Sequence, residues 1–186
     1  PTTDLSTLAD WGTDHLESIL AVDSQSDAAS PEIPSTAGQR ALSTQLQRFF
    51  EGLGYGATCD EFANLIVHLP SRLPAGTAAP SVALMCHLDT SEGTRPIARL
   101  LRANAWDGGQ ITYPEGPHLQ VTADAYAGVR PFVGEDVLHG PGDAPVGLDD
   151  KLGISELMTL ARLLAAEPAL PHGELWLVFR PDEEIG

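Results

Sequence analysis

Three short groups of histidine and acidic residues have the composition of a metal site. The first group is His87-Leu88-Asp89-Thr90, which comes at the end of an apolar run with strand character. Because side chains alternate along a strand, His87 and Asp89 are expected to project to the same side. A carboxylate near a metal-binding imidazole commonly orients it, so this pair has the right chemistry. Taken alone, the motif is also explained by an ordinary polar strand end, which is the commoner case.

The second group is Gly147-Leu148-Asp149-Asp150-Lys151, just before a helix that is expected to begin near Asp150. Acidic residues are favoured at helix N-termini by capping and by the helix dipole, which accounts for one of the two aspartates. Capping and the helix dipole account less well for the presence of both aspartates. An aspartate can bridge two metal ions through its two oxygens, and two-metal hydrolases hold their ions about 3.5 to 4 Å apart.

The third group, Asp182-Glu183-Glu184, lies in residues 181–186, after a predicted strand over residues 174–179. Adjacent carboxylates repel one another unless cations or solvent neutralise them. A solvated acidic turn is the commoner explanation for such a run by itself, and a metal site is the alternative.

The interpretation of the three groups as one site is favoured by their common position at the ends of predicted strands or at the start of the following helix. Open α/β sheets place their sites there. One histidine with several carboxylates suits zinc, manganese or cobalt. The cysteines, Cys59 and Cys86, lack the paired spacing of a structural zinc finger, and Cys86 is expected to pack in the core.

The apolar periodicity predicts alternating helices and strands. Helices are expected over residues 4–20, 36–53 and 150–166, the second with a capping box between Thr36 and Gln39, and strands over residues 64–69, 81–87, 118–122 and 174–179. The run over 81–87 is nearly all apolar, which suits a strand covered on both faces. The fold class expected is therefore α/β, with a layered central sheet flanked by helices.

At these motifs the sequence resembles peptidase T, the tripeptide aminopeptidase, within the two-zinc peptidases that include carboxypeptidase G and acetylornithine deacetylase. The match spans most of the chain. It is carried by Ile33-Pro34-Ser35-Thr36 with Gly38-Gln39, His87-Leu88-Asp89-Thr90-Ser91, Gly108-Gly109 with Ile111, Gly147-Leu148-Asp149-Asp150-Lys151 with Gly153-Ile154, Pro171-His172-Gly173, and residues 181–186. The runs 33–39 and 171–173 point to the peptidase T branch.

The resemblance implies a role for each candidate site residue. His87 would bind one zinc ion, Asp149 would bridge two, and Glu184 would bind the second. Asp89 would orient His87, and Glu183 would act as the general base. The resemblance also implies a cis peptide bond after Asp149.

The family has further parts for which residues 1–186 hold no counterpart: another carboxylate ligand, a late histidine and a lid domain. Residues 1–186 are therefore expected to be the N-terminal portion of the catalytic domain, truncated before the lid domain and inactive alone. The complete protein would form a homodimer through that lid and act on small peptides.

Composition excludes other classes of partner. The formal net charge is -16, from 26 acidic against 10 basic side chains, and would repel nucleic acid and anionic lipid. No apolar stretch is long enough to span a bilayer, and the N-terminus does not resemble a signal peptide. With few cysteines as well, the expected location is cytoplasmic.

Two alternatives stay open at this stage. A related carboxypeptidase or N-acyl-amino-acid deacylase would use the same metal residues, and a non-catalytic binding module could carry acidic loops for solubility. The remaining histidines are weaker candidates. His15 and His68 fall in a predicted helix and strand, where packed or surface roles are expected, whereas His118, His139 and His172 fall in loops and are expected to be solvated.

Overall fold

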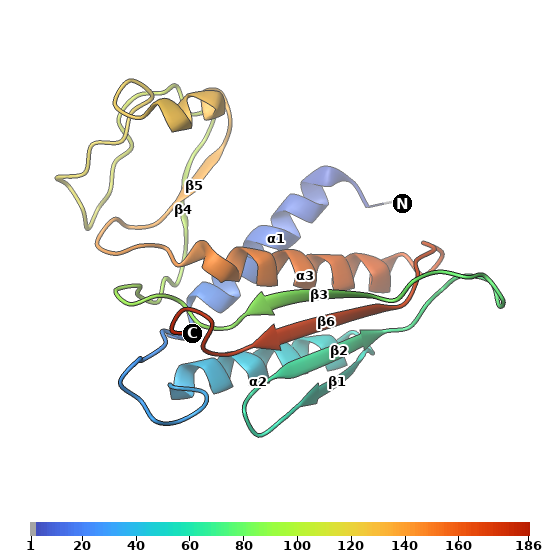
Figure 1. The fold of residues 1–186 in the computed structure, drawn as a ribbon. Helices are drawn as coiled ribbons and strands as arrows, with labels where there is room; N and C mark the ends of the chain where they lie inside the picture. The colour runs from blue at the N-terminus through green and yellow to red at the C-terminus, as the bar shows by residue number, and fades with distance from the viewer. Residues whose placement is uncertain (1–2) are drawn as a thin grey trace.

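Helices and strands alternate along residues 3–186, the part of the chain that the computed structural model describes (Figure 1). The helices are α1 (Leu5–Leu20), α2 (Ala37–Gly52), α3 (Leu148–Ala166) and the short 3-10 helix η1 (Ala127–Phe132). The strands are β1 (Gly56–Cys59), β2 (Leu65–Leu69), β3 (Val82–His87), β4 (Leu101–Ala103), β5 (Val137–His139) and β6 (Leu175–Arg180). The predicted α/β class is confirmed.

The longer elements lie within a few residues of their predicted positions, and the errors fall on short ones. The strand predicted over residues 118–122 is wrong. These described residues form a turn and irregular chain, in which the Leu119 N–H donates to the Gly116 carbonyl at 2.9 Å. The short strands β1, β4 and β5 were not predicted, because runs of three or four residues carry too little alternation to be recognised.

The main sheet places β6 between two strands that come earlier in the chain. Within residues 3–186 its order is β1-β2-β6-β3, with β6 antiparallel to β2 and parallel to β3. The prediction that residues 81–87 form a strand covered on both faces is wrong for the described chain, since β3 lies at the sheet edge and Met85 is 61% exposed. An apolar run shows that a strand meets a core, but it does not show whether a second layer covers its other face.

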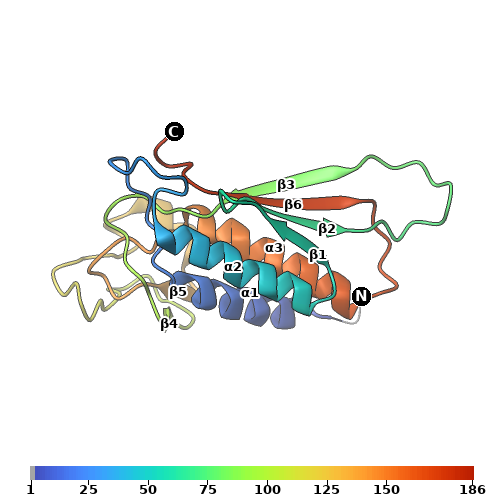
Figure 2. The same ribbon diagram turned by 90° about the horizontal axis from the view of Figure 1, so that it is seen from below.

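Helices α2 and α3 pack on the same side of this sheet, and α1 packs against α3 (Figure 2). Strand β2 shows the resulting alternation. Leu65, Val67 and Leu69 are fully buried under the helices, whereas Ile66, between them, is 44% exposed. The core consists of such inward-facing strand residues and the apolar faces of the helices, including Phe50, Leu177, Phe179, Ile154 and Met158.

The parallel pairing of β3 and β6 is the feature that positions the site. In a parallel pair the carboxyl ends meet at one edge of the sheet, and here His87 lies opposite Arg180 at those ends. Figure 1 shows the two arrowheads pointing to the start of α3 and to the C-terminal loop. The three acidic and histidine groups found in the sequence therefore arrive at the same edge.

The N-terminus of α2 differs from the prediction in its capping. Thr36 is the N-cap residue, but its hydroxyl donates to the Gln25 carbonyl at 2.8 Å. The Gln39 side chain turns instead to Asp182, which follows β6. The predicted capping box is therefore wrong, because partners from distant parts of the chain take up both of its side chains.

Strands β4 and β5 form a separate two-stranded antiparallel sheet beyond the helix layer (Figure 1). It belongs to residues 90–142, which the sequence left largely unassigned. In the described part of the chain we find no helix with the length and apolar character needed to cross a membrane.

Gly38 in the first turn of α2 packs directly against the loop before it. A methyl group at this position would lie 1.6 Å from the Asp23 carbonyl oxygen, a backbone atom that cannot rotate away. We expect Gly38→Ala to lower the free energy of unfolding by about 2 kcal/mol or more, the cost typical of overpacking. Urea unfolding followed by circular dichroism measures the change.

Gly52→Ala provides the matched control in the same helix. Apart from its two neighbours in the chain and the adjoining helix backbone, no described atom lies within 4 Å of a methyl group there, so the change in stability should stay within about 1 kcal/mol. Equal unfolding midpoints for the two variants would show that the approach of α2 to Asp23 is not as close as described.

Candidate metal centre

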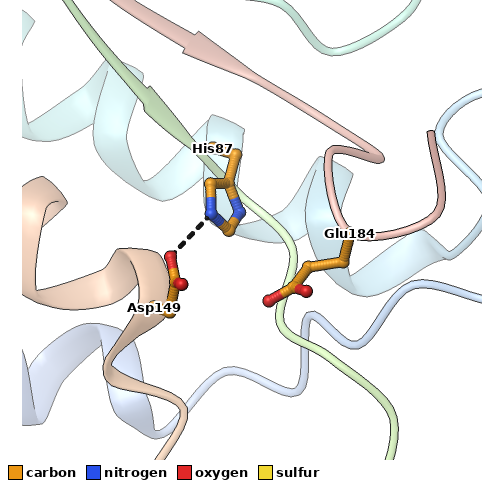
Figure 3. A group of neighbouring side chains, drawn as sticks. All are labelled: His87, Asp149 and Glu184. Atoms are coloured by element: carbon orange, nitrogen blue, oxygen red, sulfur yellow. Dashed lines mark hydrogen bonds and ion pairs between the residues drawn. The ribbon is translucent and has the colours of Figure 1, made fainter.

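The side chains of His87, Asp149 and Glu184 meet at the carboxyl edge of the main sheet (Figure 3). One possible ligand atom from each lies within 4.8 Å of the other two. The Nε2 atom of His87 is 3.0 Å from Oδ1 of Asp149, and Figure 3 shows the Glu184 carboxylate facing the same space. Residues from the three separate sequence groups are thus brought together as expected.

Asp149 reaches this position through an irregular start to α3. Gly147 has a φ of 71°, in the left-handed region that favours glycine. Asp149 itself has a non-helical backbone, with φ -84° and ψ 108°, and the peptide bond from Asp149 to Asp150 is cis, as the resemblance implied. This backbone turns the Asp149 carboxylate outward, so that its side chain is 85% exposed beside His87.

Asp150 turns to the other side of the helix start. Its carboxylate lies near the Cys86 thiol, and both would contact a side chain added at Gly153. Burial, together with the nearby Asp150, raises the pKa of Cys86 to about 12. The thiol is therefore held protonated in the core, which agrees with the packing role expected for it.

His87 is held from behind by Asp89. The Nδ1 atom of His87 lies 3.0 Å from the Asp89 carbonyl oxygen and 3.4 Å from its carboxylate Oδ1. If Nδ1 carries the proton that these oxygens accept, Nε2 presents its lone pair towards Asp149 and Glu184. The orienting role expected for Asp89 stays a prediction.

Asp89 also makes contacts that the sequence did not predict. Its Oδ1 accepts a hydrogen bond from the Glu183 N–H at 2.9 Å, and its Oδ2 accepts one from the Glu184 N–H at 3.0 Å. Asp89 is fully buried. These bonds involve backbone groups 94 and 95 positions away, and no local pattern reports such partners.

Glu183 lies beside the cluster without belonging to its closest set of ligand atoms. Its Oε2 is 3.9 Å from Nε2 of His87, and its side chain is 48% exposed. A carboxylate so placed can reach a water molecule or a substrate group at the same edge.

The electrostatics of the His87–Asp89 pair favour the charged form of both side chains. The hydrogen bond with Asp89 raises the pKa of His87 against the effect of burial, Asp149 raises it further, and the result is a pKa of about 9. Burial alone would raise the pKa of Asp89, but hydrogen bonds from His87 and from the backbone of Glu183 and Glu184 bring it to about 2. At neutral pH and without metal, an imidazolium thus occupies the centre of a carboxylate cluster.

The remaining histidines lie outside this cluster, in varied settings. His15 is buried against Phe49 and Thr159, and His68 stacks on Trp176 and pairs with Glu174. These are the packed and surface roles expected for them.

The three histidines that were expected in solvated loops have surroundings that differ from one another. His118 lies in an exposed turn, as predicted. His139 belongs to β5 and packs edge-on against Tyr113, so its assignment to a loop is wrong. His172 is partly buried, with Nδ1 2.7 Å from the Gly173 carbonyl oxygen.

Comparison with known proteins gives consistent relatives along most of the chain, although no family model matches it. Curated peptidase T from Macrococcus caseolyticus is 34% identical over 176 residues, which are 93% of this chain and 42% of that protein. Peptidase T from Aeromonas hydrophila is 34% identical over 168 residues, covering 87% of this chain and 39% of that protein. The predicted resemblance to peptidase T is confirmed, and the chain spans about two fifths of the length of these relatives.

Solved structures share the fold. A tripeptidase from Staphylococcus aureus aligns with a TM-score of 0.62 and 18% identity, covering 95% of this chain and 37% of its own. Aminopeptidase PepT from Bacillus cereus aligns with a TM-score of 0.60 and 18% identity, with the same coverage. The α/β arrangement described above is therefore that of part of these peptidases.

Binding of a divalent metal ion should release close to one proton from His87 at pH 7. With a pKa of about 9 the imidazole starts protonated, and a ligating imidazole must be neutral. Below pH 9, metal affinity should therefore rise about tenfold for each unit of pH. Calorimetry with zinc in buffers of different ionisation enthalpy measures the protons released.

The matched variants are His87→Ala, which should abolish most of the proton release and weaken binding, and His68→Ala, which should change neither. Metal binding at pH 7 with the same proton release in wild type and His87→Ala would contradict the role of His87.

Proposed function

We propose that residues 1–186 are the N-terminal portion of the catalytic domain of a metal-dependent aminopeptidase that releases the N-terminal residue from tripeptides. The observation that carries this proposal is the meeting of His87, Asp149 and Glu184 within 4.8 Å. It occurs in a chain that is 34% identical to a peptidase T over 93% of its length. The lid domain, the other part of the catalytic domain and a homodimer interface would belong to the rest of the complete protein.

We propose that this donor set would serve two zinc ions in the complete protein. His87 would hold one ion through Nε2, Asp149 would bridge both through its two oxygens, and Glu184 would hold the second. One nitrogen and several carboxylate oxygens form a set that zinc accepts, and the backing of His87 by Asp89 is typical of zinc-binding histidines. Asp149 and Glu184 are exposed, so an ion can reach them from solvent.

The residues of the chain divide the remaining chemistry among them. When bound, the metal ions would supply Lewis-acid activation of a water molecule and of the peptide carbonyl. Glu183 would take the proton from the attacking water and deliver it to the leaving amine. Asp89 would keep Nδ1 of His87 protonated and, by binding the two backbone N–H groups, would hold Glu183 and Glu184 at the centre.

Other expectations from composition remain predictions. The acidic chain is expected to act on small peptides, without nucleic acid or membrane partners, in the cytoplasm. A related two-zinc carboxypeptidase or deacylase would use the same centre, and a binding module would use none of its chemistry, so substrate experiments must separate the three.

Glu183→Gln in the complete protein should lower kcat for a free tripeptide by about 10² to 10⁴-fold, because an amide cannot take the proton from water. Its content of bound metal should stay unchanged, since Glu183 is outside the proposed ligand set. Steady-state kinetics and elemental analysis measure the two quantities. Glu61→Gln, on an exposed turn, is the matched control and should behave as wild type. Retention of full turnover by Glu183→Gln would remove the proposed base.

The complete protein should hydrolyse a free tripeptide at least about 10²-fold faster than its N-acetylated form, because a site that binds an amino group leaves its polar groups unpaired with the blocked peptide. Equal or faster cleavage of the blocked peptide would favour the deacylase or carboxypeptidase alternative. Cleavage of neither would favour the binding module. Residues 1–186 alone should show negligible turnover on the free tripeptide.

A further inference from the structure

The loop that carries Glu183 and Glu184 is attached to the N-terminus of α2 by a hydrogen-bonded network. The Asp182 carboxylate accepts bonds from the Ser35 N–H at 2.8 Å and the Ser35 hydroxyl at 2.5 Å. The Nε2 group of Gln39 donates to the same carboxylate at 2.6 Å. Three donors from α2 and the residue before its N-cap thus converge on Asp182, which directly precedes Glu183 and Glu184.

Both the nitrogen and the oxygen of the Gln39 side-chain amide form hydrogen bonds with Asp182. While Nε2 donates to the Asp182 carboxylate, Oε1 accepts the Asp182 backbone N–H at 2.9 Å. The amide of Gln39 can do both at once, because its NH2 group is a donor and its oxygen is an acceptor. Gln39 is fully buried, so loss of the bond to Oε1 would leave a buried amide oxygen unpaired, whereas Nε2 also donates to the Ser35 hydroxyl oxygen at 3.1 Å.

With Asp89, this network binds three consecutive backbone N–H groups of the loop. Gln39 accepts from Asp182, and Asp89 accepts from Glu183 and from Glu184. Asp182 has a φ of 56°, a conformation that is unfavourable for a residue with a side chain and that tertiary contacts must hold. The direction of the two glutamate side chains is therefore determined from two other elements.

The same network also reaches a second segment that lines the cavity beside Glu184. The Ser35 hydroxyl oxygen accepts the Asp27 N–H at 2.9 Å and the Nε2 group of Gln39 at 3.1 Å. Asp27 and Glu184 both line that cavity. The Ser35 hydroxyl, which Gln39 contacts, thus connects the acidic loop with the segment that carries Asp27.

We propose that Gln39 is a positioning residue, which sets the geometry of Glu183 and Glu184 by its two-point hydrogen bonding to Asp182. It touches neither substrate nor metal and acts through the loop. The kinetic part of this inference rests on the function proposed above. The structural part, that Gln39 orders the loop, can be measured without any catalysis.

The decisive variant is Gln39→Glu in the complete protein. In its ionised form, at a pH above its own pKa, the new carboxylate would keep the shape of the side chain and could accept the Asp182 N–H, but it would face the Asp182 carboxylate without a proton to donate. We expect kcat for a free tripeptide at saturating metal to fall about 10²-fold, the loss typical of a misplacement of about 1 Å, with a smaller change in KM. Amide hydrogen exchange of residues 182–184 should accelerate.

The rescue variant is Gln39→Glu combined with Asp182→Asn. An asparagine at position 182 can donate to the new carboxylate, so the pair exchanges donor and acceptor while keeping the same contact. This double variant should recover most of the lost kcat and slow amide exchange. Gln45→Glu, the same substitution on a part-exposed position of α2, should leave kcat and exchange unchanged.

Several outcomes would overturn the inference. One is a folded Gln39→Glu protein with wild-type kcat and exchange, even if its unfolding temperature falls, because a purely structural role predicts that result. Another is a double variant that folds but has a kcat as low as that of the single variant. If Gln39→Glu alone does not fold, the double variant is compared with wild type, and a folded double variant with a kcat about 10²-fold lower would contradict the inference. If the wild type cleaves no tripeptide, the proposed function fails, and amide exchange in the same variants still decides whether Gln39 orders the loop.

Discussion

The buried carboxylate of Asp89 is the interaction on which the candidate centre depends. A fully buried charge is costly unless hydrogen bonds or an opposite charge compensate it. Asp89 receives both, from the His87 imidazole and from the backbone of Glu183 and Glu184. One side chain therefore joins the end of β3 to the loop after β6, and each of these two segments carries residues of the proposed metal site.

The parallel pairing of β3 with β6 makes that interaction possible. It brings the two strand ends side by side, and α3 starts at the same edge with the exposed Asp149 carboxylate. The carboxylates of Asp149, Glu183 and Glu184 then lie near one imidazole. Without a cation such grouping is unfavourable, because like charges repel at short range. The raised pKa of His87, to about 9, is one response of the metal-free protein, since a proton there supplies a positive charge.

The hydrogen bonds around the acidic loop show how a site with high repulsion can keep one geometry. The glutamate carboxylates stay exposed and free to bind, while the backbone that carries them is bound on one side by Asp89 and on the other by Gln39. Pre-organised backbone of this kind reduces the ordering that ligand binding would otherwise require. Gln39 and Asp89 lie in residues 33–39 and 87–91, two of the runs on which the predicted resemblance to peptidase T rests.

The sequence by itself was sufficient for the α/β class, the long helices and the strands over 64–69, 81–87 and 174–179. It also singled out five candidate residues, of which the structure brings His87, Asp149 and Glu184 together. Their signals are local: apolar periodicity, acidic runs at strand ends and motifs shared with a family. Only the tertiary structure decided that β3 lies at a sheet edge, that Gln39 binds Asp182 instead of a helix cap, and that Asp89 binds the backbone of Glu183 and Glu184. Those hydrogen bonds join residues 94 to 143 positions apart. They depend on which strands pair, and strand pairing is determined by packing across the whole domain and not by any short run of residues.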